Sequence, residues 1–530
     1  MRRAFLSILA ITVLAGACSD GSAIEEQAGR SADTADSSAD SLTVGDDPDG
    51  LAGAVGTAGD EGSESPDRLA AVATTLRLGV LSTIPDSPQS ASPVDAGQLM
   101  VADLLADGLT RLDHTGAATA SLAESWEHNE DATSWLFNLR PDARFSDGSP
   151  LTAGDVKRSL EAVAGNADLL AGEALSAIVG FDKAAERNQM SGLTALDDQT
   201  LQIDLTVPVG YLDRLLAMPA LGVSGRDRAD ASSAWTVESR SANLVVLTTS
   251  ENPAGDIDTI EVHRLADVDS AEAAFENGDL DLVWLGVGVQ NEAATYFDGH
   301  VTAFLGSRLT SEVVGDAELR TKLEGSLDRE SLVSEVFGEA AQPLWGLVPA
   351  GLTPDPITCV RDCFDRTPAE VALAERFGQD GERPTVTLDH SAGGWQADLA
   401  VSVARDLEAT GLNVESIANS NQELTSVLGG DEVDFFLLGT VAQSSAPEAY
   451  LLSLFGTGAS QNLTGYENPL VDSLSEVDGA SVARAEQAVM ADDPVFPLAQ
   501  MNHSVLVGPR AEAVELHLDG TLVLERLEFG

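Results

Sequence analysis

Residues 384–439 decide the fold class, and they read PTVTLDHSAGGWQADLAVSVARDLEATGLNVESIANSNQELTSVLGGDEVDFFLLG. Short apolar runs alternate here with a helical segment in which Leu399, Val403 and Leu407 share one stripe. The pattern predicts strand, helix, strand, helix and strand at residues 385–388, 395–409, 412–417, 423–428 and 433–438. Such a βαβαβ unit indicates an α/β fold with a largely parallel sheet covered by helices.

A second stretch of the chain repeats part of this pattern. Residues 274–284 (AFENGDLDLVW) and 426–436 (SVLGGDEVDFF) both read as a helix end, a glycine, an acidic residue and an apolar strand. Two copies roughly 150 residues apart predict two α/β lobes, although helix–glycine–strand connections are common enough for the match to be a coincidence. Alternating apolar residues predict further strands at residues 76–80, 135–139 and 201–205.

The composition is strongly acidic. The 530 residues include 86 Asp and Glu against 29 Lys and Arg, which gives a formal charge of −57. An acid surplus this large excludes a nucleic-acid binder that depends on phosphate contacts. Apolar residues make up 43% of the chain, which is enough for hydrophobic cores. Most of the chain is therefore expected to fold, in about two or three domains or lobes.

The N-terminus has the pattern of an export signal. Arg2 and Arg3 precede an apolar run over residues 4–14, which is too short to span a bilayer, and small residues then lead to Cys18. Small residues immediately before a cysteine resemble the lipobox of bacterial lipoproteins, in which the cysteine is acylated after cleavage, although Ala15 stands where Leu is usual. We predict a signal peptide over residues 1–18 with lipidation at Cys18; an ordinary cleaved signal is the alternative.

Residues 19–73 are expected to form a flexible acidic tether after that anchor. Over residues 19–70 the chain has 13 Asp and Glu, two Arg and no aromatic residue. Such a segment cannot bury enough apolar surface to offset the entropy lost on ordering. The alternative is a low-complexity insertion without a role. Membrane attachment is predicted through the lipid alone, because no later stretch is long and apolar enough to cross a bilayer.

Two further cysteines, Cys359 and Cys363, lie four residues apart in CVRDC. In an exported protein this spacing predicts a short-loop disulfide. A metal site would need more Cys or His ligands nearby, and none lies between Trp345 and Leu388. We therefore predict no metal and no cofactor.

Four blocks of sequence resemble a known family. In order, they are DGLTRLD (107–113), LAESWE (122–127), WLFNLR (135–140) and FSDGSPLTAGDV (145–156). In this order and spacing they are similar to the bacterial extracellular solute-binding proteins of family 5, the peptide-binding and nickel-binding receptors of ABC importers, and weaker similarity extends over about residues 75–510. The blocks themselves are structural, since SDG favours a turn and Thr152 with Asp155 fits a helix capping box.

The resemblance implies a two-lobed α/β fold of the periplasmic-binding-protein type, of the large type II class with an extra subdomain. Lobe I is expected over residues 74–300, with the inserted subdomain at about 100–195. Lobe II is expected over residues 301–490, and residues 491–530 return to lobe I. Ligand contacts made on both lobes only in the closed state would drive closure of the cleft.

The function that the resemblance implies is capture of a peptide or similar small polar solute outside the cytoplasm and its delivery to ABC permease subunits. The protein is expected to be a monomer held at the outer face of the cytoplasmic membrane, in the periplasm where the host has an outer membrane. A surface receptor or sensor of the same fold is the alternative. An extracellular hydrolase is the weakest hypothesis, because the chain has no phosphate loop, nucleophile elbow or HExxH helix.

One segment departs from the family pattern. Peptide-binding members usually have an acid in a Trp-rich segment after the last sheet strand, and this acid pairs with the ammonium group of the peptide. Here residues 439–450 read GTVAQSSAPEAY, so that Gln443 replaces the acid and Thr440 replaces the Trp. Losing the carboxylate should weaken capture of a free N-terminus by roughly one to two decades, unless another acid such as Glu448 replaces it.

The remaining candidate contacts follow from position. Gly439 and Tyr450 bound the altered segment and are candidate ligand-binding residues with Thr440 and Gln443. Another group is expected at the carboxyl ends of strands, where open α/β sheets bind ligands. Its members are Ser82 and Thr83 after the first strand, and Trp395, which either stacks on ligand or covers the core.

Overall fold

The computed structural model describes residues 74–92, 95–165, 174–184, 189–225, 232–249, 257–359, 363–378, 383–430, 433–442, 444–475 and 479–529. The predicted signal peptide, Cys18 and the acidic segment 19–73 lie outside the described residues, and so does Gln443. Within the described ranges, none of the helices has the length and apolar character that a membrane crossing requires.

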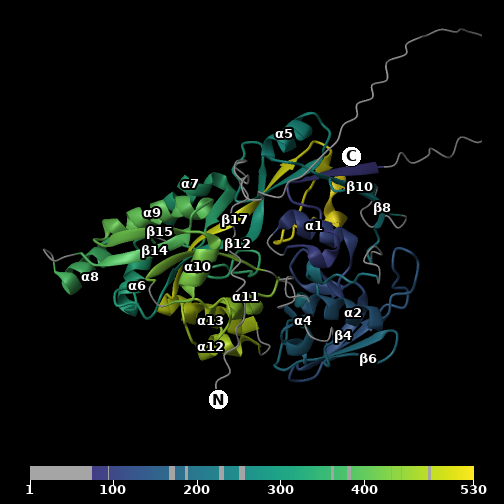
Figure 1. Ribbon diagram of the computed structural model, residues 1–530, viewed down its shortest axis with the longest axis horizontal. Helices are drawn as coiled ribbons and strands as arrows, with labels where there is room; N and C mark the ends of the chain where they lie inside the picture. Colours follow the sequence, from purple (N-terminus) through teal and green to yellow (C-terminus); the bar gives the residue numbers. More distant parts are fainter. Residues whose placement is uncertain are drawn as a thin grey trace, which may run out of the picture. The chain divides into compact units, whose positions relative to one another are not determined.

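One sheet of eleven strands runs through the described part of the chain (Figure 1). Its main path has the order β15-β14-β16-β12-β17-β11-β1-β10-β9-β8, and β13 pairs with β17. The strands are β1 (Thr74–Val80), β8 (Thr236–Arg240), β9 (Leu244–Thr248), β10 (Ile257–Arg264), β11 (Leu282–Val287), β12 (Thr295–Ser307), β13 (Ala341–Pro343), β14 (Thr385–Ser391), β15 (Asn413–Asn419), β16 (Phe435–Val441) and β17 (Val495–Val507).

Pairing within this sheet is mixed. β1 is parallel to β10 and β11, and β14 is parallel to β15 and β16. The other pairs are antiparallel. The prediction of a largely parallel sheet is therefore wrong. The reason is that two long strands, β12 and β17, lie between the two parallel groups and run antiparallel to each other and to their neighbours.

The strands β12 and β17 connect two halves of the sheet, β15-β14-β16 on one side and β11-β1-β10-β9-β8 on the other. Figure 1 shows β12 and β17 side by side. Each has 13 residues. Their register shifts between Phe297 and Val301, where β12 has more residues than β17. Beyond this shift, Val301, Ala303 and Leu305 belong to the core that includes residues of α7 (Arg329–Phe337) and α9 (Trp395–Ala409). Phe304 belongs to the core with α11 (Pro447–Phe455) and α13 (Gly479–Asp492). One strand thus supplies two cores from its two faces.

The stretch that predicts the fold class forms the expected elements. The chain runs through β14, α9 (Trp395–Ala409), β15, α10 (Asn421–Leu428) and β16. Leu399, Val403 and Leu407 of α9 are all buried in the core with β14 and β16. The α9–β15 turn passes through Gly411, whose φ of 108° favours glycine. The βαβαβ prediction is confirmed, with strand ends displaced by a few residues.

The two copies of the sequence pattern also form equivalent structures. The first is α5 (Val268–Glu276) followed by β11, and the second is α10 followed by β16. β11 is parallel to β1 in one half of the sheet, and β16 is parallel to β14 in the other. Each half thus contains a parallel α/β group.

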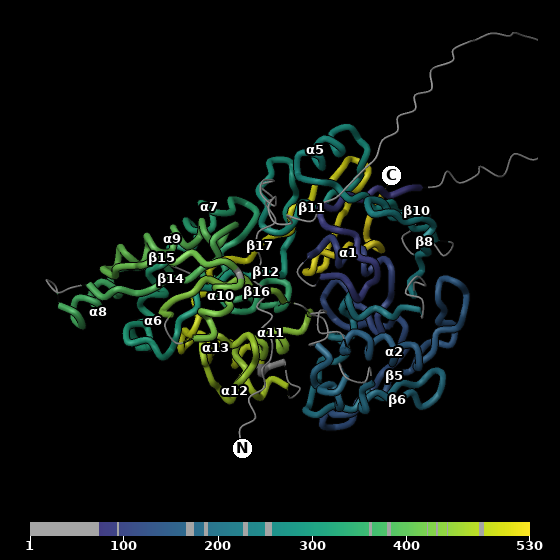
Figure 2. Tube along the Cα trace, in the orientation of Figure 1, coloured from purple at the N-terminus to yellow at the C-terminus, as the bar shows by residue number. Residues whose placement is uncertain are grey.

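A separate four-stranded antiparallel sheet has the order β4-β5-β7-β6, and α2, β5 and β6 lie together in Figure 2. Its elements are β4 (Ala123–His128), β5 (Ser134–Leu139), α2 (Ala153–Ala164), β6 (Leu193–Ala195) and β7 (Thr200–Asp204). Thr152 and Asp155 form the predicted capping box. The hydrophobic core of this subdomain includes residues from Leu109 to Val223, among them Leu212 and Leu221 after β7, and also Ala446. The expected bounds of the lobes and of the subdomain stay predictions.

The other described elements complete the two halves and the loops between them. They are η1 (Pro88–Ser90), α1 (Ala96–Leu105), β2 (Thr110–Leu112), β3 (Ala118–Ala120), η3 (Phe181–Lys183), α4 (Leu212–Leu215), η4 (Pro219–Leu221), α6 (Ala317–Glu324), α7 (Arg329–Phe337), η5 (Gly338–Ala340), α8 (Thr367–Phe377), α11 (Pro447–Phe455), α12 (Pro469–Asp472), η6 (Ser473–Ser475), α13 (Gly479–Asp492), β18 (Ala511–Glu512), η7 (Leu524–Arg526) and β19 (Glu528–Phe529).

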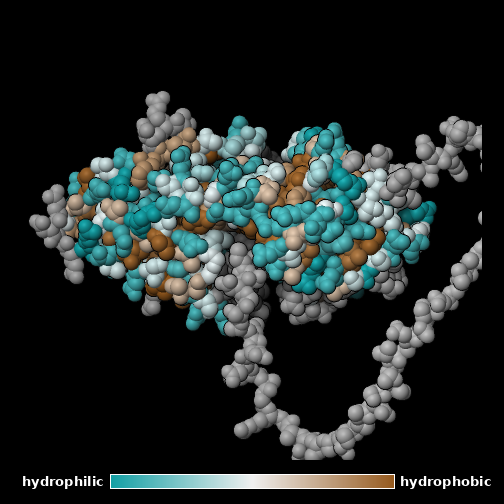
Figure 3. Space-filling view, turned by 90° about the horizontal axis from the view of Figure 1, so that it is seen from above, coloured by the Kyte–Doolittle hydropathy of each residue, from teal (hydrophilic) through white to brown (hydrophobic). Residues whose placement is uncertain are grey.

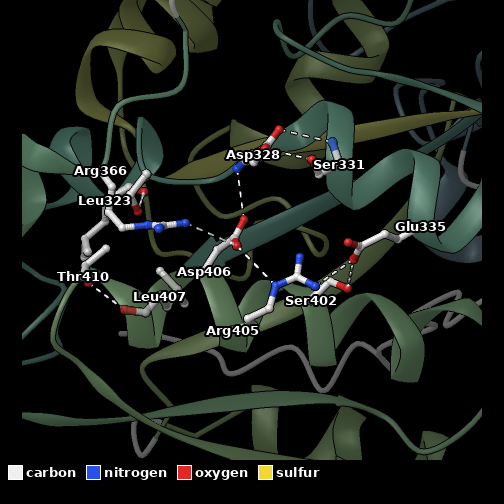
Figure 4. Close-up of polar contacts among 11 residues, drawn as sticks. Leu323, Asp328, Ser331, Glu335, Arg366, Ser402, Arg405, Asp406, Leu407 and Thr410 are labelled. Atoms are coloured by element: carbon white, nitrogen blue, oxygen red, sulfur yellow. Dashed lines mark hydrogen bonds and ion pairs between the residues drawn. The ribbon is translucent and has the colours of Figure 1, made fainter.

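A buried ionic network joins the helices of one half (Figure 4). Asp406 of α9 is 4% exposed and accepts a hydrogen bond of 3.0 Å from the backbone N–H of Asp328. Its other oxygen lies 3.7 Å from Arg366 Nη2 and 3.6 Å from Arg405 Nε. Burial raises the pKa of Asp406, and these partners partly oppose that effect. The network fixes α9 against α7 and the start of α8.

The predicted disulfide between Cys359 and Cys363 is present. The face of the molecule in Figure 3 is dominated by hydrophilic residues, with smaller hydrophobic areas among them. This surface agrees with the high content of acidic residues.

Candidate ligand-binding site

A cavity of about 290 Å³ lies where five parts of the chain meet. The subdomain contributes residues 114–116 and Arg214, and the shared strand β12 contributes Phe297 and Asp298. Further walls come from residues 351–352, from Ala442, Ser444 and Ser445, and from the C-terminal segment 514–519. Apolar side chains thus alternate with a few polar groups, as is typical of small-molecule sites.

The segment that departs from the family pattern reaches this cavity. Ala442, Ser444 and Ser445 line it, on either side of Gln443. The Oγ atom of Ser445 is buried and has no hydrogen-bond partner among the described residues. Because this atom has almost no accessible surface, it does not face the cavity, and the hydroxyl is covered by the protein itself.

Thr440 and Tyr450 lie in the core next to the cavity and do not line it. Their hydroxyls are 3.0 Å apart, and the hydroxyl of Thr302 lies 2.9 Å from Thr440 and 2.7 Å from Tyr450. Burial raises the pKa of Tyr450 to about 12. These three hydroxyls satisfy one another, so packing accounts for both residues. Gly439 pairs with Ala303 in the β12–β16 ladder. As ligand contacts, Gly439, Thr440 and Tyr450 stay predictions.

Glu448 already has a cationic partner. Arg214 Nη2 donates to both carboxylate oxygens of Glu448 at 3.0 Å, and the two side chains are 24% and 14% exposed. Nearby, Ala446 packs into the core of the subdomain. The start of α11 is therefore fastened to the subdomain, and Glu448 is not free to replace the missing acid.

The other three predicted contacts lie elsewhere. Thr83 Oγ1 accepts a hydrogen bond of 3.2 Å from Gln98, and Ser82 precedes it after β1. The Trp395 ring packs 5.8 Å from the ring of Phe337 and against the core of its own half. None of these three lines the cavity. The structure does not bring them together with residues 442–445, and their contact with ligand stays a prediction.

Two buried histidines hold one wall of the cavity. His300 Nδ1 and His503 Nε2 both donate to the backbone carbonyl of Leu518, at 3.1 and 2.9 Å, and their rings lie 5.4 Å apart. Burial, with a smaller effect of His300, lowers the pKa of His503 to about 4. Because these histidines belong to β12 and β17, the shared strands position the Leu518 loop, which lines the cavity.

The charged residues of the cavity were missed by sequence reasoning. They are Arg214, Asp298, Glu515 and Asp519, together with His114 and His517. Glu515 forms an ion pair of 3.0 Å with Arg526, and Asp298 accepts from Gln342 Nε2 at 3.0 Å. The resemblance ends near residue 510, so no motif marked residues 515 and 519. No cluster of side chains suited to a metal ion occurs among the residues that the structure describes.

The sequence model of bacterial extracellular solute-binding proteins, family 5 Middle, matches residues 117–462. The chain belongs to this family. Members of the family are binding receptors rather than enzymes, and the predicted family and fold class are confirmed.

Two named relatives match this chain over most of their own length. The periplasmic murein peptide-binding protein MppA of Escherichia coli is 23% identical over 80% of this chain and 88% of its own. The periplasmic oligopeptide-binding protein OppA of E. coli is 24% identical over 76% of this chain and 83% of its own. A structure of MppA in an unliganded open form has a TM-score of 0.75 and 19% identity, and the match covers 87% of this chain and 98% of that chain.

Proposed function

We propose that the protein is the substrate-binding receptor of an ABC importer, and that it captures a peptide or similar small polar solute and delivers it unchanged to a permease. The observation that carries this proposal is the cavity lined by the subdomain, by β12 and by the segment after β16 in a chain of this family. The names of MppA and OppA, which describe peptide-binding proteins, support a peptide or a molecule like one.

Binding is proposed to work by closure of the two halves around the ligand. A ligand shifts an equilibrium between two conformations only by its difference in affinity for them. The cavity is lined by several parts of the chain, for example by Arg214 and Ser445. Contacts between these parts and the ligand favour the closed state if they are stronger there than in the open state. The shared strands β12 and β17 are the connection between the halves about which such a movement would occur.

Attachment to the membrane is proposed to occur through a lipid on Cys18, followed by the acidic tether. The protein would then stay at the outer face of the cytoplasmic membrane, in the periplasm of a host with an outer membrane. Replacement of Cys18 by Ala should release the protein from the membrane fraction and abolish incorporation of a labelled fatty acid. Retention in the membrane with no label would contradict lipidation.

Mass spectrometry of the molecule that co-purifies with the protein tests the proposed function most directly. We expect one class of small polar solute, which also raises the melting temperature when it is added back, as linkage between binding and folding requires. Loss of uptake of that solute after deletion of the receptor gene completes the test. The proposal fails if no member of a broad solute and peptide library is bound.

A surface receptor or sensor without an import role is the second candidate. The observation that favours it is Thr440, which forms a core contact with Thr302 and Tyr450 at the position where the family has a Trp. Normal uptake of the bound solute in a strain that lacks the receptor would favour this candidate over import.

A further inference from the structure

Helix α11 packs into two different cores. One face of the helix supplies four residues to the core that also contains Phe304 of β12, namely Tyr450, Leu451, Leu454 and Phe455. On another face, Ala446 is fully buried in the core of the subdomain, and Ala449 and Leu452 pack against that core. These three residues follow one another at intervals of three and therefore form one stripe. The helix thus follows β16 in one half of the sheet and docks on a subdomain that the chain inserts between β1 and β8 of the other half.

Two further contacts join the same parts of the chain. Arg214 of the subdomain donates from Nη2 to both carboxylate oxygens of Glu448 at 3.0 Å. Gly116, in the turn between β2 and β3, lies so close to Ser445 that a Cβ atom at its position would be 3.8 Å from the Cβ atom of Ser445. Gly116, Arg214 and Ser445 all line the cavity. The contact between α11 and the subdomain therefore borders the cavity.

Protein groups alone complete this contact. The carboxylate of Glu448 has its cationic partner, and the side chain of Ala446 has its apolar surroundings. A movement of the two halves about β12 and β17 would expose the apolar stripe to water and separate a partly buried ion pair, and both changes are unfavourable. The contact therefore favours the closed arrangement before any solute binds, because the free energies of the two conformations set their populations.

We propose that residues 445–452 are a clasp, which joins the subdomain to the other half in the ligand-free protein and shuts one side of the cavity. A solute then enters and leaves only while the clasp is open. This inference rests on the proposed function, because it concerns closure around the same cavity. Closure driven by the ligand alone would leave the free protein open, whereas the clasp keeps it mostly closed and slows association.

A pair of cysteines tests the contact in the full chain after bound solute has been removed by dialysis. The double variant Gly116→Cys and Ser445→Cys places two thiols where the 3.8 Å between the Cβ positions suits a disulfide. We expect mild oxidation to link the two positions, and mass spectrometry of the digested protein identifies the linked peptides. Ser444→Cys in place of Ser445→Cys is the matched control and should link more slowly.

A second measurement leaves Gly116 unchanged, because its φ of 79° is unfavourable for cysteine. Pulsed electron resonance measures the distance between nitroxide labels on p-acetylphenylalanine introduced at Glu130 and Glu408, which are exposed positions on the subdomain and on α9. We expect mainly the shorter distance in the free protein. Glu448→Gln should lower the ratio of closed to open molecules roughly fivefold, whereas Glu335→Gln, which breaks an ion pair within one half, should not change it.

The outcomes separate this inference from the proposed function. A free protein that is mostly in the longer-distance state, or a ratio that Glu448→Gln leaves unchanged, overturns the clasp even if a solute is bound and imported. A folded cysteine variant that does not link also overturns it, and melting temperatures report folding; if that variant does not fold, the distance measurement decides. If the free protein is closed as expected but binds no member of a solute library, the clasp stands and the proposed function fails.

Discussion

Two groups of carboxylates in this protein have opposite surroundings. Asp406 is buried and receives the N–H of Asp328 and the charges of two arginines (Figure 4). Asp298 and Asp519 lie at a cavity, and their described hydrogen bonds come from neutral groups. The protein itself partly compensates the first charge, whereas the other two have no cationic partner within ion-pair distance among the described residues.

The difference separates stability from binding. A buried carboxylate that is held by several partners is expensive to disturb, because these partners lose their acceptor when it is removed. A carboxylate that faces a cavity contributes little to folding and keeps its capacity for a ligand. The following predictions test this distinction, from the largest expected effect to the smallest.

The largest effect is expected for Asp406→Ala. The variant leaves the N–H of Asp328 and the nearby arginines without their acceptor, so the free energy of unfolding should fall by about 3 kcal/mol. Urea denaturation measures this loss. Asp398→Ala, an exposed position on the same helix, should change stability by less than about 0.5 kcal/mol. A loss below that of the control would show that the network is not important for folding.

The next effect is a pH dependence that involves the cavity wall. His503 has its pKa lowered from 6.5 to about 4 by burial, so the unfolded chain binds this proton more tightly than the native one. The contribution of neutral His503 to the free energy of unfolding is fully present above pH 6.5. As the pH falls toward 4, the free energy of unfolding decreases by up to about 3 kcal/mol through this group. Urea denaturation between pH 7 and 4.5 should show a shallower loss for His503→Gln than for the wild type.

The groups around His503 define what would contradict that prediction. His300 stacks on the ring and adds to the lowering of the pKa, whereas Asp519 opposes it. Asp406 has a raised pKa, so its protonation favours the native state at low pH and opposes the effect of His503. Because this contribution is the same in both proteins, the wild type is compared with His503→Gln. Equal pH slopes for the wild type and His503→Gln would exclude the histidine as the cause.

A smaller effect is expected at the contact between the subdomain and α11. The pair of Arg214 and Glu448 is partly buried, so a double-mutant cycle with Arg214→Met and Glu448→Gln should give a coupling of about 1 kcal/mol. Thermal and urea unfolding of the four proteins measure it. A coupling near zero would mean that Ala446 alone fastens this segment.

The smallest effect on stability is expected in the cavity. Asp298→Asn and Asp519→Asn together should change the free energy of unfolding by less than about 0.5 kcal/mol, since no ion pair is broken. Urea denaturation of the free protein checks this. A loss comparable to that of Asp406→Ala would mean that these carboxylates are part of the scaffold, and the contrast between the two regions would not hold.

Much of the fold was predictable from local patterns. Leu399, Val403 and Leu407 have helical spacing because one face of α9 is buried. Thr152 and Asp155 predicted a helix start because capping depends on residues three positions apart. The disulfide between Cys359 and Cys363 was predictable for the same reason, since both partners lie in one short loop.

The site was harder to predict, because its residues come together only in the tertiary structure. Arg214 and Glu448 are 234 positions apart, and neither lies in a motif that names the other. Asp298 lies at the cavity because of the register shift in β12, and Asp519 because of a loop held by His300 and His503. The mixed pairing of the sheet was missed for a similar reason, because strand neighbours are not set by local periodicity.

The register shift in β12 has a consequence for the tolerance of this strand to mutation. Four steps along β12, from Phe297 to Val301, match two steps along β17, from His503 to Met501, so an even number of residues is added. Side chains alternate with a period of two, and an even insertion leaves Val301, Ala303 and Leu305 on the same face of the ribbon. Deleting one residue from this bulge would exchange the two faces of the following part of β12, so that Phe304 would leave the core with α11 and α13 for the core with α7 and α9. Substitution is also restricted in this bulge, because a Cβ on Gly299 would overlap the backbone carbonyl of Met501.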